Sequence, residues 1–168
     1  MTDTINHSRR ALFGGRRTLP SAVLRPPWAL PDDRFSALCS GCGLCITVCP
    51  ERILIPDRCR LPQIDFSRGE CTFCRDCVTV CPEPAFGNTD QRPWQQTARI
   101  DSHCLTGQGV YCESCRDPCE SRAIRFHPAL GGLALPQVDA DRCSGCGACV
   151  AVCPSDAIRV VRSDNKSC

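Results

Sequence analysis

The fold is decided by a short stretch that reads C-S-G-C-G-L-C-I-T-V-C-P from Cys39 to Pro50. Its first three cysteines, Cys39, Cys42 and Cys45, are each separated by two residues, and three residues separate Cys45 from Cys49, which directly precedes the proline. Thiolate sulfur is a soft metal ligand, and a looping backbone can bring thiols at this spacing around one metal-containing group. The stretch therefore predicts a loop wrapped around a metal centre.

The same pattern recurs along the chain in four cysteine groups, which begin at residues 39, 71, 104 and 143. Groups one, two and four follow it without deviation; they are Cys39, Cys42, Cys45 and Cys49; Cys71, Cys74, Cys77 and Cys81; and Cys143, Cys146, Cys149 and Cys153. Group three is stretched, with Glu120 in place of the proline; it consists of Cys104, Cys112, Cys115 and Cys119. A repeat of this period indicates tandem copies of one small unit.

Iron–sulfur clusters are favoured by this spacing over zinc and over disulfides. Zinc sites usually join two separated cysteine pairs, and a disulfide framework belongs to exported proteins. Three thiols at two-residue gaps suit three irons of one [4Fe-4S] cluster. Cysteine makes up 18 of 168 residues while 5% are aromatic, so bound metal must supply much of the folding free energy. We expect four [4Fe-4S] clusters, with the one at group three less regular.

The fourth ligand of each cluster is expected from a different group. In bacterial two-cluster ferredoxins the cysteine before proline ligates the other cluster. The predicted ligand sets are Cys39, Cys42, Cys45 and Cys81; Cys71, Cys74, Cys77 and Cys49; Cys104, Cys112, Cys115 and Cys153; and Cys143, Cys146, Cys149 and Cys119. This exchange ties groups one and two together, and groups three and four.

The segments between the groups predict an α+β fold of tandem ferredoxin-like modules. Residues 53–55 and 62–65, and residues 123–126 and 136–139, each read as two short strands joined by a turn. Short helices are expected at 44–48 and 148–152, carrying the last cysteine of their groups. The predicted layout is a flexible basic arm at 1–30, a two-cluster module at 31–90 and a second module at 91–168.

The basic charge is concentrated in the predicted arm. Residues 1–30 carry five arginines and one aspartate, a charge of +4 against a total of +2, so the remaining residues sum to −2. Arg9 and Arg10 resemble the start of a twin-arginine signal, but Gly14-Gly15-Arg16-Arg17 follows instead of an apolar run. We therefore expect a cytoplasmic protein that does not span a membrane. Without aromatic platforms the arm suits an acidic protein surface better than nucleic acid, and Arg9 and Arg10 are its candidate partner contacts.

Two further cysteines and one histidine stand outside the pattern. Cys59 and Cys168 lack ligand spacing and are expected to be free thiols. His103 precedes Cys104 and could replace a ligand, although a hydrogen-bonding role is favoured. No nucleophile–base pair, open metal site or cofactor loop is evident, so the sequence predicts no enzymatic activity.

Beyond the clusters, the chain resembles the NapF family, ferredoxin-type accessory proteins of the periplasmic nitrate reductase system. The resemblance rests on Ser8-Arg9-Arg10, on Arg25-Pro26-Pro27-Trp28, on the order of the cysteine groups and on the irregular group three. It implies a protein that binds the molybdenum-containing catalytic subunit precursor before export and helps to mature it. Two alternatives stay open: a general polyferredoxin electron carrier, and clusters that serve as folding staples only.

Overall fold

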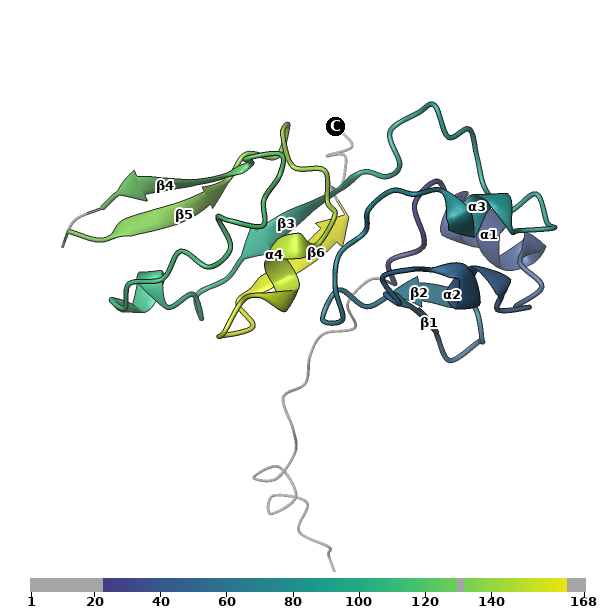
Figure 1. The fold of residues 1–168 in the computed structure, drawn as a ribbon, viewed down its shortest axis with the longest axis horizontal. Helices are drawn as coiled ribbons and strands as arrows, with labels where there is room; N and C mark the ends of the chain where they lie inside the picture. The colour runs from purple at the N-terminus through teal and green to yellow at the C-terminus, as the bar shows by residue number, and fades with distance from the viewer. Residues whose placement is uncertain (1–22, 130–131, 163–168) are drawn as a thin grey trace, which may run out of the picture.

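The computed structural model describes residues 23–129 and 132–162 and has two halves that lie side by side (Figure 1). The first half, residues 23–95, contains α1 (Asp32–Leu38), α2 (Leu44–Val48), β1 (Leu54–Pro56), β2 (Pro62–Ile64) and α3 (Asp76–Thr79). The second half, residues 96–162, contains β3 (Gln96–Ile100), η2 (Thr106–Gln108), β4 (Ile124–Pro128), β5 (Ala134–Val138), α4 (Ala148–Ala151) and β6 (Ile158–Arg162). This mixture of short helices and strands agrees with the predicted α+β class.

Each half contains the hairpin that the sequence predicts. β1 pairs with β2 in antiparallel register, with Leu54 opposite Ile64. β4 pairs with β5 in the same way, with Ile124 opposite Val138. In both hairpins the first strand follows the last cysteine of one group, and the second strand precedes the next group. The hairpins therefore connect the paired groups, as predicted.

A second pairing joins the beginning and end of each half. In the second half β3 pairs with β6 over five residues, from Gln96 opposite Arg162 to Ile100 opposite Ile158. In the first half a single antiparallel bridge between Ala29 and Phe86 occupies the corresponding place. The sequence analysis did not predict either pairing, although both close a half around its cysteine groups.

The structure corrects the predicted end of the basic arm, because residues 23–30 are packed into the fold. The Leu24 carbonyl accepts a hydrogen bond from the Ile64 amide at 2.8 Å, and the Trp28 amide donates to the Pro93 carbonyl at 2.7 Å. Arg25, assigned to the arm, forms an ion pair with Asp57 at 2.9 Å. Residues 1–22, including Arg9 and Arg10, lie outside the described residues.

The short helices occur where they were predicted, but they carry a different cysteine. α2 spans Leu44–Val48, as expected, and α4 ends at Ala151, one residue early. Each contains the third cysteine of its group, Cys45 or Cys149. The last cysteine follows the helix because the next residue is proline, which disfavours helical backbone before it.

Within residues 23–129 and 132–162 the buried apolar residues form three small clusters instead of one large core. One lies in the second half around Ala98, Ala123 and Ile158. Another surrounds Leu54 in the first half. The third joins the halves, because Val160 of β6 packs with buried residues of the first half; these are Leu24, Ile53 and Phe66.

Candidate metal centres

Group one and the last cysteine of group two surround one cavity in the first half. The thiols that line it are Cys39, Cys42, Cys45 and Cys81. Phe35 and Phe86 also line this cavity, with their rings edge to face at a centroid distance of 5.8 Å. These are the four thiols predicted to share a cluster, and aromatic rings shield one side of them.

Group two and the last cysteine of group one surround a second cavity. The thiols that line it are Cys49, Cys71, Cys74 and Cys77. Ile53 and Leu54, both buried, contribute apolar surface beside them. The hairpin between groups one and two thus brings each fourth cysteine to the other group's three thiols.

The second half gathers its thiols in the same crossed manner. Burial raises the pKa of the Cys115 thiol to about 11, and its thiol neighbours also raise it; these are Cys104, Cys112 and Cys153. Burial likewise raises the pKa of the Cys149 thiol to about 12, again with contributions from neighbouring thiols; these are Cys146, Cys143, Cys115 and Cys119. The stretched group three therefore still delivers Cys104 to the same place as Cys112 and Cys115.

Burial has the same effect on the thiols of the first half. It raises the pKa of Cys45 to about 11 and those of Cys71 and Cys77 to about 12. Without a cation these thiols hold their protons at neutral pH. Iron binding must therefore release protons, and the positive charge of the iron offsets the cost of burying thiolates.

Groups one, two and four share an unusual backbone. The residue directly after the second cysteine of each group is in the left-handed region: Gly43 at φ 78°, Arg75 at φ 71° and Gly147 at φ 84°. This residue is the N-cap that directly precedes the helix carrying the third cysteine. Non-glycine residues rarely adopt this conformation, so Arg75 shows that the loop geometry overrides local preference.

The residues outside the pattern behave largely as expected. Cys59 is exposed at the tip of the β1–β2 hairpin and is absent from the two cavities that the grouped thiols surround, although it lines a separate pocket with Cys39. Cys168 lies outside the described residues. His103 Nδ1 lies 3.6 Å from an oxygen of Asp101, so it has a carboxylate neighbour of its own. In residues 23–129 and 132–162 no three His, Cys, Asp or Glu side chains form a site for a single metal ion. A cubane presents its irons at separate corners, so its ligands stand farther apart than those of one ion.

Sequence analysis missed two sets of residues near the thiols. In the first half a glutamate stands two residues after the last cysteine of each group. These are Glu51 after Cys49 and Glu83 after Cys81, and both line cysteine cavities. In the second half the same position is Ser121 or Ser155, whose hydroxyls lie 3.6 and 3.7 Å from Cys119 and Cys153 sulfur. An alignment of the four groups would have found this difference.

Family comparisons define the class of protein to which these centres belong. A 4Fe-4S dicluster domain matches residues 38–86, which contain groups one and two. A 4Fe-4S binding domain matches residues 136–159, which contain group four. Group three lies outside both matches. The chain is therefore a ferredoxin-type protein with 4Fe-4S binding domains.

Individual relatives narrow this class to one family. The ferredoxin-type protein NapF of Haemophilus influenzae is 47% identical over 135 residues, which cover 80% of this chain and 77% of the relative. NapF of Escherichia coli K12 is 40% identical over 154 residues, which cover 92% of this chain and 94% of the relative. The methylamine utilization ferredoxin-type protein MauM of Methylophilus methylotrophus is 32% identical over 169 residues, which cover 86% of this chain and 72% of the relative. The chain belongs to the NapF family of ferredoxin-type proteins, which confirms the predicted resemblance.

In the part of the chain that the structure describes, no helix is both long enough and apolar enough to cross a membrane.

Proposed function

We propose that the chain is a cytoplasmic iron–sulfur accessory protein that binds the catalytic subunit precursor of periplasmic nitrate reductase before export and assists its maturation. Four [4Fe-4S] clusters are held by the crossed ligand sets; these are Cys39, Cys42, Cys45 and Cys81; Cys71, Cys74, Cys77 and Cys49; Cys104, Cys112, Cys115 and Cys153; and Cys143, Cys146, Cys149 and Cys119. Such clusters supply one-electron transfer when bound.

The observation that carries the proposal is the cavity lined by three thiols of group one and by Cys81 of group two. Cys81 is 36 residues beyond Cys45 in the chain, and only the β1–β2 hairpin and the group two loop bring it back. Cubane geometry requires thiols from several directions, and soft thiolates are the ligands that iron–sulfur clusters use. The nitrate reductase role rests on the family resemblance.

Metal analysis tests the cluster part of the proposal. Anaerobically purified protein should contain about 16 iron and 16 acid-labile sulfide per chain, four of each for every cluster. About 12 of each would mean that group three holds no cluster. Zinc without sulfide would overturn the proposal.

Single substitutions test the crossed ligand sets. Cys81→Ala should remove the cluster of group one, and Cys49→Ala should remove that of group two, each with a loss of about four iron. Cys59→Ala is the matched control, because Cys59 is an exposed thiol of the same half that belongs to none of the proposed ligand sets. If Cys81→Ala erased the spectrum of the group two cluster and left that of group one, the crossing would be refuted.

Co-purification tests the partner. The full chain should retain the catalytic subunit precursor, and a variant that lacks residues 1–22 should retain less. The deletion should stop before Val23, because Leu24 and Trp28 are packed in the fold. Arg9→Ala with Arg10→Ala should weaken binding, whereas the matched pair Arg16→Ala with Arg17→Ala should not.

A general electron carrier is the second candidate. Cys42 and Cys74 are exposed, so the clusters of groups one and two lie near the surface, where a redox partner can approach. A carrier would show only weak, salt-sensitive contact with any one partner. Undiminished binding of the precursor by the full chain at high salt would favour the accessory role.

A further inference from the structure

The loops of groups two and four touch where the halves meet. The Cys71 amide donates a hydrogen bond to the Cys146 carbonyl at 2.8 Å. Trp94 Nε1 donates to the Ser144 carbonyl, also at 2.8 Å. The Phe66 ring rests directly on Gly147, since a Cβ built there would lie 2.0 Å from the ring. Only a glycine permits this approach, and the joint is therefore closely packed.

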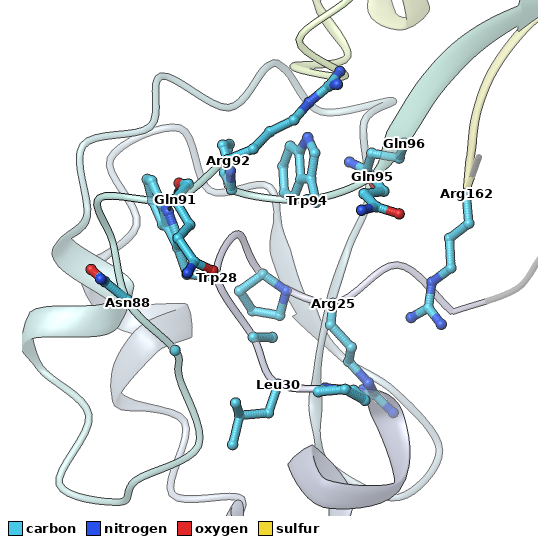
Figure 2. Close-up of a pocket in the computed structure, with 15 residues that line it drawn as sticks. Arg25, Trp28, Leu30, Asn88, Gln91, Arg92, Trp94, Gln95, Gln96 and Arg162 are labelled. Carbon is cyan, nitrogen blue, oxygen red and sulfur yellow. Dashed lines mark hydrogen bonds between the residues drawn. The ribbon is translucent and has the colours of Figure 1, made fainter. Parts of the chain in front are cut away.

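Side chains from the first half reinforce this joint. Figure 2 shows Trp94 between Arg92 and Gln96 on the wall of a cavity of about 690 Å³ that lies along the seam and is lined by no cysteine. Arg92 donates to the Cys143 carbonyl at 2.9 Å. The Trp94 ring lies edge to face with Phe66 and Phe73, at centroid distances of 6.2 and 5.4 Å. Aromatic rings and hydrogen bonds to backbone carbonyls thus fix the position of group two relative to group four.

The joint gives the four groups a spatial order that differs from their sequence order. Groups one and two share one half through their crossed thiols, and groups three and four share the other. Because groups two and four meet at the seam, the order is one, two, four, three. With clusters bound, this order would place the four centres as successive neighbours from group one to group three.

The residues around the thiols differ in charge and hydrogen bonding between the halves. Glu51 and Glu83 line the cavities of the first half. In the second half, Ala123 and Ala157 amides donate to Cys119 and Cys153 sulfur, each at 3.3 Å. The hydroxyls of Ser121 and Ser155 approach the same two sulfur atoms. A cluster-bound thiolate has no proton, so each hydroxyl must be the donor.

These surroundings act on reduction in opposite directions. A nearby carboxylate disfavours the added negative charge of a reduced cluster and lowers its potential. Hydrogen bonds to ligand sulfur favour the reduced cluster and raise its potential. The carboxylates would lower the potentials in the first half, against the opposing charge of Arg75 in the Glu51 cavity, and the hydrogen bonds would raise those in the second half.

We propose that the contact between groups two and four is an internal electron-transfer joint that carries electrons from the first half to the second. The proposal rests on the proposed function, because it requires clusters in both halves. In the step, the cluster held by group two is oxidised by one electron and that held by group four is reduced by one. Charge balances without proton transfer or a further reactant.

A potentiometric titration followed by EPR tests the direction. Ser121→Ala with Ser155→Ala should shift the higher potentials downward, and Glu51→Gln with Glu83→Gln should shift the lower potentials upward. Ser67→Ala is the control, because its exposed hydroxyl bonds to the Asp65 carboxylate and Ser67 lines none of the cysteine cavities. If the serine variants shift the lower potentials, or if neither pair changes any potential, the direction is refuted.

Spin coupling tests the joint itself. When neighbouring clusters are both reduced, their unpaired spins interact and broaden the EPR signal. Phe66→Ala should open the joint and narrow this signal, and the milder Arg92→Ala, at an exposed position, should do so to a smaller extent. Leu135→Ala, at an exposed position in the outer hairpin of the second half, should leave it unchanged.

Iron and sulfide analysis of each variant separates the two proposals. A wild-type chain without sulfide would refute the proposed function, whatever the EPR result. Fully loaded Phe66→Ala and Arg92→Ala proteins with an unaltered coupled signal would refute the joint alone. Equal narrowing in Leu135→Ala would also refute it, because that exposed side chain is in none of the contacts of the joint. If Phe66→Ala loses its clusters, Arg92→Ala decides the outcome.

Discussion

The two halves contain the same cysteine repeat but hold it in different ways. The second half has two antiparallel ladders of five residue pairs each, whereas the first half has one ladder of three pairs and a single bridge. The first half instead buries aromatic rings, with Phe35 at 0% and Trp28 at 8% exposure. The repeat therefore positions the thiols, while the surrounding sheet or aromatic packing determines how stable the fold of each half is when no metal is bound.

Removing the iron should produce the largest difference in stability between the two halves. An anaerobic chelator should unfold the first half completely while much of the second half remains, because two five-pair ladders survive the loss of metal better than one short hairpin. Hydrogen exchange measured by mass spectrometry should show β1 and β2 losing protection before β3 and β6. Simultaneous loss in both halves, relative to a sample without chelator, would contradict the comparison.

Trp28→Ala should cause the largest effect of a single substitution outside the cysteines. Trp28 is buried, its Nε1 donates to the Gln91 carbonyl at 2.9 Å, and Arg75 stacks on it at 5.6 Å. Truncating such a ring costs about 3–5 kcal/mol of unfolding free energy. Anaerobic urea denaturation followed by circular dichroism measures the loss. Phe126→Ala is the control in the second half, where a half-buried ring should cost about 1–2 kcal/mol.

Equivalent glycines in the two halves should differ in their tolerance of a methyl group. Gly43 and Gly147 both directly follow the second cysteine of their group at positive φ, so alanine adds about 1–2 kcal/mol of backbone strain at either. A Cβ at Gly43 meets nothing within 4 Å, whereas at Gly147 it enters the Phe66 ring. Gly147→Ala should therefore cost a further 1–3 kcal/mol, roughly, from overpacking.

The same urea denaturation measures this pair of variants. Equal losses for Gly43→Ala and Gly147→Ala would mean that the Phe66 contact contributes nothing. Combining Phe66→Ala with Gly147→Ala offers a second check, because removing the ring should relieve the overpacking and leave only the backbone strain.

The cysteine repeat made the local structure of the chain predictable. The spacing of each group, the proline after Cys49 and the strand patterns around Ile64 and Ile124 are local signals, and the hairpins and short helices followed from them. The crossed arrangement of Cys49 and Cys81 followed from the chemistry of two-cluster ferredoxins. The structure places the thiols accordingly.

The contacts between distant segments could not be predicted. Leu24 and Trp28 lie in a proline-rich stretch without strand periodicity, so nothing local indicated that this stretch closes the first half. The Cys71–Cys146 contact joins residues 75 positions apart and depends on Gly147 accepting Phe66. Such contacts are decided by shape complementarity, which a single sequence does not encode in any local pattern.

The weakest expected effect concerns an ion pair that also joins the halves. Asp32 in the first turn of α1 lies 2.8 Å from Arg162 of β6 and 3.4 Å from Arg25. The hydrogen bond from Arg162 is the main reason that the pKa of Asp32 lies below its usual value of 3.8. A carboxyl with a lowered pKa stabilises the fold above its unfolded-state pKa, and this contribution is lost as pH falls through the lower, folded-state value.

Asp32→Asn should therefore lower the unfolding free energy by less than about 1 kcal/mol at neutral pH, because the carboxyl is 42% exposed and solvent screens the pair. The difference from wild type should persist down to about pH 5 and shrink below about pH 4. Asp33→Asn is a matched control, since Asp33 shares the first turn of α1 and its helix-dipole effect but is exposed. If both variants behave alike, the helix dipole and not Arg162 explains the effect, and the halves depend on the aromatic joint instead of this ion pair.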